Sequence, residues 1–197
     1  MRLGLYRGIW QSVRLLARPL YRIEIVGRIP QSACVVAANH ESLLDPPLLA
    51  LASKRPLRFL AKEDLWRYRP GAWLMDALGA VPVARGREGY VAIDRAAELI
   101  RAGESVAIFP EGTVRGGTWT RGAARLALAT GVPLVPVRIV GTARALSRGR
   151  LGLPRIRIVV GEPIAVESTH ATVVAARELT RALETAIEGL ASIRSKS

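Results

Sequence analysis

A histidine and an aspartate stand five residues apart in the segment Asn-His-Glu-Ser-Leu-Leu-Asp, which follows the apolar run 33–38. An imidazole near its ordinary pKa can take a proton from a hydroxyl group, and a carboxylate beside it holds the tautomer. His40 and Asp45 are therefore a candidate general base and its partner. On a continuous helix the two side chains would point about 140° apart, so their pairing requires a corner at which the chain folds back.

Both residues also have a purely structural interpretation. The run from Ser42 to Asp45 is typical of a capping box in front of an apolar helix. His40 is equally compatible with a hydrogen-bonded loop histidine. The spacing alone leaves the chemical and the structural interpretation open.

Two further charged residues follow short apolar runs, and a proline interrupts a third run. Arg85 comes after the run 81–84, and Glu111 comes after the run 105–110. Pro136 stands inside Val-Pro-Val, where a strand proline predicts an edge, a bulge or a special contact. These residues extend the set of chemically useful side chains beyond the His-Asp pair.

Alternating strands and helices are needed to position these residues. Hydrophobic patterning predicts strands at 22–27, 32–39, 57–61, 81–84, 105–110, 133–141 and 155–163. Helices are predicted at 43–53, at 65–80 as one or two short pieces, and at 88–104, 123–131 and 168–190. Pro46 and Pro47 fit a first helical turn, and Gly103 and Gly131 fit helix ends.

This alternation predicts a single α/β domain with a mostly parallel central sheet flanked by helices. In such folds the ligand site lies beyond the carboxyl ends of the strands. His40, Arg85 and Glu111 each follow a predicted strand. We therefore expect their side chains to meet at one edge of the sheet.

The first twenty residues predict an amphipathic helix that ends near Pro19. Apolar residues recur at three- and four-residue steps and arginines fall between them. This helix either packs on the core or lies in a membrane interface, and the sequence leaves both open. We divide the chain into an amphipathic helix at 1–20, which we expect to associate with a membrane, and a second domain at 21–197.

The composition narrows the class of partner. The 197 residues carry 29 Lys and Arg against 16 Asp and Glu, a net charge of +13. This excess indicates a polyanionic partner, but 5% aromatic residues and the lack of a nucleic-acid-binding motif argue against nucleic acid. Cys34 is the one cysteine, which excludes an internal disulfide, and its apolar neighbours indicate a core residue. No apolar run approaches the roughly 20 residues of a membrane-spanning helix.

Four blocks, taken in order over about residues 20–165, resemble the glycerolipid acyltransferase family, the enzymes similar to 1-acylglycerol-3-phosphate acyltransferase. The family blocks are N-H-x-S followed by Asp, a Gly leading through an apolar strand to Arg, F-P-E-G-T, and an apolar V-P strand. They are matched here by Asn39, His40, Ser42 and Asp45; by Gly79 and Arg85; by Phe109, Pro110, Glu111, Gly112 and Thr113; and by Val135, Pro136 and Val137.

The resemblance implies transfer of a fatty acyl group from acyl-CoA or acyl carrier protein to a lysophospholipid hydroxyl, with lysophosphatidic acid as the expected acceptor. It implies His40 as base, Asp45 as its partner, direct attack on the thioester, and no cofactor or metal. It also implies a peripheral protein on the cytoplasmic face of an anionic membrane. The implied substrate-binding residues are Asn39, Ser42, Gly79, Arg85, Phe109, Pro110, Glu111, Gly112, Thr113, Arg115 and Pro136.

One departure affects that set. The family commonly has Arg or Ser directly after the Gly-Thr of its third block, whereas Val114 stands there and Arg115 follows one residue later. Whether Arg115 contacts the acceptor phosphate is left open by the sequence.

Other functions are weighed against this interpretation. A hydrolase is disfavoured because the chain has no G-x-S-x-G elbow. An acyltransferase for another hydroxylated lipid and a non-catalytic lipid-binding module of the same fold are the alternatives. The His-Asp pair argues against the binding module, which has no need of it.

Overall fold

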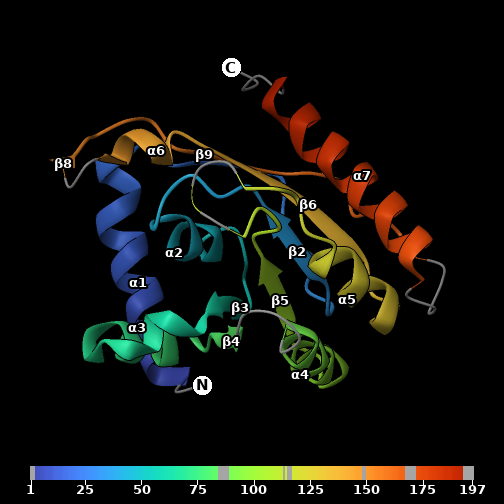
Figure 1. Cartoon of the computed structure of the whole chain (residues 1–197). Coiled ribbons are helices and arrows are strands. Elements are labelled where there is room, and N and C mark those ends of the chain that lie inside the picture. Colours follow the sequence, from blue (N-terminus) through green and yellow to red (C-terminus); the bar gives the residue numbers. More distant parts are fainter. Residues whose placement is uncertain are drawn as a thin grey trace.

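The computed structural model describes residues 3–83, 89–112, 114, 117–147, 150–166 and 172–192. Its centre is a seven-stranded sheet in the order β1-β9-β6-β2-β5-β3-β4 (Figure 1). The strands are β1 Glu24–Val26, β2 Val35–Ala38, β3 Leu57–Lys62, β4 Val81–Val83, β5 Ser105–Ile108, β6 Leu134–Val140 and β9 Arg157–Val160.

Five strands of the sheet are parallel, which confirms the predicted architecture. Strand β2 lies between β5 and β6, and β3 connects β5 to the edge strand β4, all in parallel pairs. The direction reverses at β9, which is antiparallel to β6, and β1 pairs parallel with β9. The sequence pattern did not predict this reversal. A separate antiparallel pair, β7 Leu146–Ser147 and β8 Arg150–Leu151, was not predicted either.

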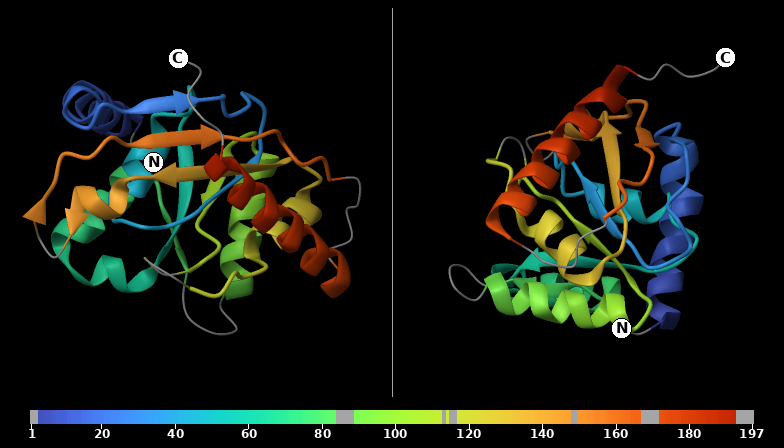
Figure 2. Two further views of the ribbon diagram at one scale, coloured as in Figure 1. Left: turned by 90° about the horizontal axis from the view of Figure 1, so that it is seen from above. Right: turned by 90° about the vertical axis from the view of Figure 1, so that its right-hand side faces the viewer.

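Helices cover both faces of the sheet (Figures 1 and 2). In chain order they are α1 Leu3–Leu20, α2 Asp45–Ala50, η1 Glu63–Arg67, α3 Arg69–Leu78, α4 Gly89–Arg101, α5 Gly122–Thr130, α6 Thr142–Ala145, α7 Val173–Gly189 and η3 Leu190–Ser192. The predicted helix ends are confirmed: α2 has its prolines in the first turn, and Gly131 caps α5 with φ +68°.

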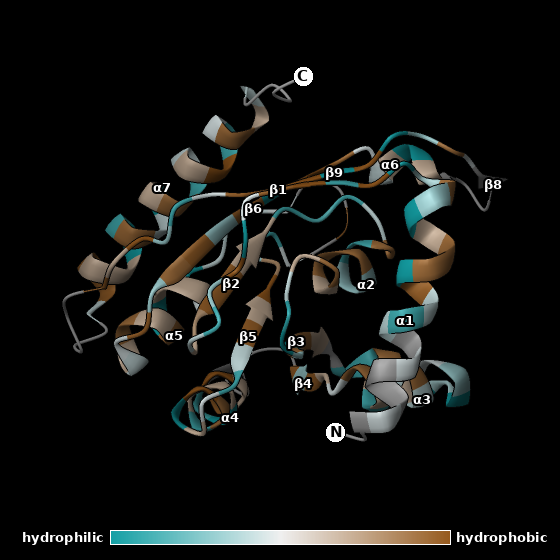
Figure 3. Cartoon of the chain, turned by 180° about the vertical axis from the view of Figure 1, so that it is seen from behind, coloured by the Kyte–Doolittle hydropathy of each residue, from teal (hydrophilic) through white to brown (hydrophobic). Residues whose placement is uncertain are grey.

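The sheet separates two apolar cores. Alternate β2 residues face opposite sides: Val36 and Ala38 pack with α2, whereas Val35 and Ala37 pack with α4, α5 and α7. Buried strands of this kind are hydrophobic on both faces because helices cover both. Figure 3 shows this arrangement as hydrophobic strands between helices whose polarity varies around their axes.

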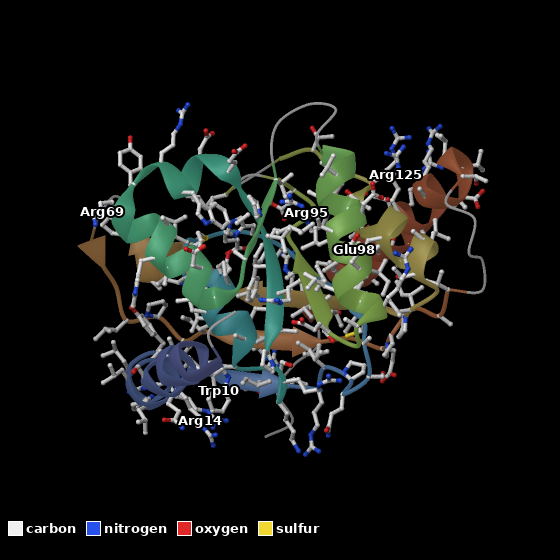
Figure 4. All side chains as sticks on the ribbon, turned by 90° about the horizontal axis from the view of Figure 1, so that it is seen from below. Trp10, Arg14, Arg69, Arg95, Glu98 and Arg125 are labelled. Atoms are coloured by element: carbon white, nitrogen blue, oxygen red, sulfur yellow. The ribbon has the colours of Figure 1, made fainter. Side chains whose placement is uncertain are left out.

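Helix α1 divides its side chains between the core and the solvent. Trp10, Val13 and Ala17 pack against the core on the α2 side, and the Trp10 indole N–H donates to the Ala50 carbonyl oxygen at 3.0 Å. The Arg14 guanidinium lies 5.2 Å from the Trp10 ring centroid (Figure 4). Leu15, Leu16 and Leu20 are exposed instead. Core packing therefore holds for one face of α1 and leaves a second apolar face uncovered.

None of the helices in the described part of the chain combines the length and the apolar character needed to cross a membrane.

Candidate active site

Three polar segments meet where the central strands β2, β5 and β6 end. These strands are neighbours and run in the same direction, so the segments that follow them reach the same edge of the sheet (Figure 1). Residues 39–45 follow β2, residues 109–112 follow β5, and the last residues of β6 lie on the other side of β2. This is the edge at which parallel α/β sheets place their ligands.

His40 and Asp45 are in contact across a corner. The chain turns directly after β2, and α2 begins with Asp45, so the carboxylate points back at the residues before it. His40 Nδ1 lies 2.9 Å from Asp45 Oδ2. The His40 side chain is 13% exposed and that of Asp45 is fully buried. The imidazole is thus held from behind and retains an accessible side.

The same carboxylate organises the corner. Asp45 Oδ2 accepts the backbone N–H groups of Glu41 at 2.7 Å and of Ser42 at 2.8 Å. The bond from Ser42 N–H is one half of the predicted capping box. The other half does not form, because the Ser42 hydroxyl accepts from Leu44 N–H rather than from Asp45, and Leu44 occupies the cap position. Asp45 therefore has both the structural contact and the histidine contact that its sequence position allowed.

Asn39 fastens this corner to the next strand. Its side-chain amide donates to the Ile139 carbonyl oxygen at 2.9 Å, and its carbonyl oxygen accepts from Ile139 N–H at 2.7 Å. Asn39 thus continues the β2–β6 ladder with its side chain at the point where the main chain leaves the sheet. The residue is buried, and it positions the backbone of His40.

The segment after β5 supports the imidazole from another side. The Phe109 ring stacks on His40 with centroids 4.3 Å apart and an interplanar angle of 24°. Glu111 Oε1 accepts the backbone N–H of His40 at 3.3 Å. Phe109 and Glu111 both reach His40 because they lie in one tight turn. In this turn Gly112 N–H donates to the Phe109 carbonyl oxygen, and Gly112 has φ +66°.

Two charged residues belong to this cluster but were not singled out from the sequence. Glu41 accepts a side-chain N–H of Asn39 at 3.3 Å, and its pKa is raised by burial and by the nearby Asp45 and Glu111, against the lowering effect of Arg138. Arg138 is near this cluster because β6 is adjacent to β2. Its position on an alternating strand gave no signal, whereas Glu41 was already visible beside His40.

Pro136 lies in the interior of the sheet. The sequence predicted an edge, a bulge or a special contact for it, and the edge is wrong. Two residues of β6 lie between the paired residues Leu134 and Val137, but three residues lie between their partners Ile164 and Val160. The register therefore shifts by one residue beside Pro136, as in a bulge. The missing proline N–H falls at this shift, while the Pro136 carbonyl oxygen accepts from Gly161 N–H at 2.9 Å.

Gly79 lies outside the cluster. It caps α3 with φ +64° and precedes β4. It therefore lies near the amino-terminal ends of the parallel strands, whereas His40 lies at their carboxyl ends. It lines a separate cavity of about 1130 Å³ with Arg95 and Glu98 of α4, both visible in Figure 4. Arg85, Thr113 and Arg115 fall outside the described residues, so the predicted convergence of Arg85 with His40 and Glu111 is a prediction still.

Comparison with known proteins covers the part of the chain that contains this site. The family model described as "Acyltransferase" matches residues 22–140, which contain all four sequence blocks. The chain belongs to the acyltransferase family. This assignment covers the corner between β2 and α2, the turn after β5 and almost all of β6.

Curated members of the acyltransferase family share about a third of their aligned residues with this chain. The chloroplastic 1-acyl-sn-glycerol-3-phosphate acyltransferase BAT2 of Brassica napus is 32% identical over 169 residues, covering 79% of this chain and 48% of the relative. The lyso-ornithine lipid O-acyltransferase of Pseudomonas aeruginosa is 32% identical over 135 residues, covering 66% and 52% respectively. The chain spans about half the length of these curated relatives.

A solved structure supports the fold. The crystal structure of the 1-acyl-sn-glycerophosphate (LPA) acyltransferase PlsC from Thermotoga maritima superposes with a TM-score of 0.73 at 22% identity, covering 100% of this chain and 85% of that one. Within the described residues, no group of three or more His, Cys, Asp and Glu side chains is arranged to hold a metal ion.

Proposed function

We propose that this protein transfers a fatty acyl group from a thioester to the free hydroxyl of a lysophospholipid, with lysophosphatidic acid as the expected acceptor and phosphatidic acid as the product. The observation that carries the proposal is the 2.9 Å contact between His40 Nδ1 and the buried Asp45 carboxylate, beside an accessible side of the imidazole. The names of the curated relatives support the acceptor class.

In this mechanism His40 acts as the general base. The Nδ1–H group of His40 donates a hydrogen bond to Asp45 and keeps its proton. Nε2 is then unprotonated and can take the proton of the acceptor hydroxyl. The hydroxyl oxygen attacks the thioester carbonyl carbon and forms a tetrahedral intermediate. When the carbon–sulfur bond breaks, the thiolate leaves and takes the proton back from His40. The products are the new ester and the free thiol.

We assign acceptor binding to the residues that surround this reaction. In the proposal, Arg85 and the turn from Glu111 to Thr113 hold the glycerol-phosphate group, and Arg115 is a second candidate for the phosphate. A guanidinium group suits a phosphate because it donates two parallel hydrogen bonds. Asn39, Ser42, Phe109 and Pro136 act indirectly in this scheme, by positioning the chain segments around His40.

The test is product detection by mass spectrometry. The purified chain is offered lysophosphatidic acid with either acyl-CoA or acyl carrier protein charged with the same acyl group. Formation of phosphatidic acid with one donor identifies that donor. Release of free fatty acid with no ester product from either donor would identify a hydrolase and contradict the proposal.

A lysolipid with a cationic headgroup is a second candidate acceptor. The carboxylates of Glu41 and Glu111 lie beside His40, and one relative is named a lyso-ornithine lipid O-acyltransferase. A cationic amine would be attracted by these carboxylates, whereas a phosphate would be repelled by them. Lyso-ornithine lipid and lysophosphatidic acid offered together as competing acceptors distinguish the two, since the higher kcat/KM defines the substrate.

We further propose that the segment 1–20 binds the surface of an anionic membrane on the cytoplasmic side, while 21–197 forms the acyltransferase domain. The exposed leucines of α1 support this, and so do Tyr68, Trp73 and Leu74, which are exposed on or beside the neighbouring α3. Trp10 lies against the core and is not part of this surface. Apolar insertion and arginine attraction to anionic lipids, about 1 kcal/mol per arginine, act together in such contacts.

Vesicle co-sedimentation tests the membrane contact. Replacing Leu15 and Leu16 by Ser should weaken binding to anionic vesicles roughly tenfold, since each leucine loses apolar burial. Replacing Val173 and Val174 of α7, which are also exposed, by Ser is the matched control and should leave binding unchanged. Equal binding by both double variants would show that α1 is only a core helix.

A further inference from the structure

A second cavity lies between α7 and the loop that leads into α5. Its volume is about 570 Å³, and its lining includes Trp119, Arg121, Arg177, Arg181 and Glu184. α5 and α7 lie side by side on one face of the sheet (Figures 1 and 2). None of these residues belongs to the four sequence blocks, and the His-Asp mechanism does not use them.

The charges of this cavity are unbalanced. Arg177 and Arg181 stand four residues apart on one face of α7, where like charges disfavour the helix. Arg121 approaches the cavity from the start of α5. In the described part of the chain, none of the three arginines has an ion-pair partner, although Glu184 lines the same cavity. Three exposed guanidinium groups around one hollow favour a ligand with more than one negative charge.

An aromatic ring accompanies these charges. Trp119 is partly buried, with apolar contacts to the core on the α5 side, and it also lines the cavity. A tryptophan face offers a stacking surface for a purine base. Phosphate recognition beside an aromatic face is the combination that a nucleotide with several phosphates requires.

The cavity connects to the candidate active site through one short segment. Thr120 N–H donates to the Pro110 carbonyl oxygen at 2.8 Å, and Pro110 directly precedes Glu111, which accepts from His40 N–H. Following this path with ordinary Cα spacings gives a separation of at most about 20 Å between Trp119 and His40. An extended pantetheine arm covers a separation of this order.

We propose that this cavity binds the adenosine 3′,5′-bisphosphate end of the acyl-CoA donor. The base stacks on Trp119, and the phosphates contact Arg121, Arg177 and Arg181. The pantetheine arm then follows the 110–120 contact toward His40. This assignment rests on the proposed function and adds the location of the donor, with CoA rather than acyl carrier protein as the carrier.

The test measures binding without catalysis, by titrating the full chain calorimetrically with adenosine 3′,5′-bisphosphate. The double variant Arg177→Gln and Arg181→Gln should raise the Kd about tenfold to hundredfold, as expected for lost charge-assisted contacts. The control is Arg28→Gln with Arg101→Gln, which removes the same charge from exposed residues at the edge where β2 and β5 begin. It should bind as the unmodified chain does.

Two further measurements distinguish binding of the nucleotide from binding of phosphate alone. Trp119→Leu should weaken the binding of adenosine 3′,5′-bisphosphate but leave the binding of inorganic phosphate unchanged. In the transfer assay the α7 double variant should raise the KM of acyl-CoA and leave the acceptor KM unchanged.

The outcomes are distinguishable from those that test the transfer reaction. Equal nucleotide binding by the two double variants, no nucleotide binding by the unmodified chain, or displacement by inorganic phosphate at equal concentration would overturn the donor site, even in an active enzyme. Loss of nucleotide binding confined to the α7 variant would support the site even if no lysolipid is acylated.

Discussion

The two ends of strand β2 place two reactive side chains in opposite environments. Cys34 stands just before the strand, is fully buried, and contacts the Ser105 hydroxyl at 3.5 Å. Burial raises the pKa of its thiol, and the Ser105 contact and nearby Arg55 lower it by less. His40 stands just after the strand with a carboxylate behind it and an accessible side. The comparison teaches that the direction of the strand, more than the residue type, decides which side chain stands at the edge where parallel sheets place their ligands.

The largest effect is expected at the carboxyl end. His40→Ala removes the proposed base and should reduce kcat by about 10³–10⁴-fold, the upper part of the range for general-base catalysis. The protein should remain folded because the side chain is at the surface of the core. The measurement is the rate of acyl transfer with donor and acceptor both present, combined with a thermal melt. Normal turnover by a folded variant would remove the basis of the comparison.

Asp45→Asn should have a smaller effect, about 10²-fold. The amide oxygen can take the place of Oδ2 and still accept the N–H groups of Glu41, Ser42 and His40, but the neutral amide no longer stabilises the imidazolium that forms when His40 takes the proton. The imidazole is still present, so part of the activity survives. A loss as large as that of His40→Ala would indicate that Asp45 mainly maintains the corner, and the melting temperature would then fall as well.

Glu41→Gln sharpens the comparison through pH. The raised pKa means that the folded chain holds this proton more tightly than the unfolded chain, so stability falls as pH rises from the ordinary carboxyl pKa through the raised one. Below that window the two proteins should melt alike. Above it the glutamine variant should be the more stable one, as measured by melts at pH 4 and pH 8. The same pH dependence in both proteins would contradict this origin.

The smallest effect is expected at the amino end. Cys34→Ala should leave acyl transfer unchanged and lower the free energy of unfolding by about 1 kcal/mol, for the small volume lost from the core. Incubation with the thioester alone should add no acyl mass to the protein. A stable adduct on Cys34 would reverse the comparison and make the buried end of β2 the reactive one.

The longer helices, the parallel strands and the need for a corner between His40 and Asp45 could be predicted because their signals are local. Apolar periodicity, Pro46 and Pro47 in a first turn, and Gly131 at a helix end all act within a few residues. The corner itself followed from the observation that five residues of straight helix would separate the pair.

The remaining parts depend on pairings that a local pattern does not contain. Asn39 meets Ile139, one hundred residues later, because β2 and β6 are neighbours in the sheet. The stacking of Phe109 on His40 depends on the register of β5 beside β2. The hydrophobic pattern of a short strand such as Arg157–Val160 does not depend on whether the strand runs parallel or antiparallel to its neighbour. The reversal at β9 could therefore not be predicted from it.

Strand β9 has a consequence for how the chain folds. In the seven-stranded sheet β1 is an edge strand, and β9, more than 130 residues later, is its neighbour. Contacts of such high sequence separation slow folding because a long loop must close before they form. During synthesis the segment through β1 is made first, yet it waits for the last strand before it can join the sheet. Until β9 is made, β1 has no neighbour in the sheet, so this late strand is needed to hold the segment between α1 and β2 against the sheet.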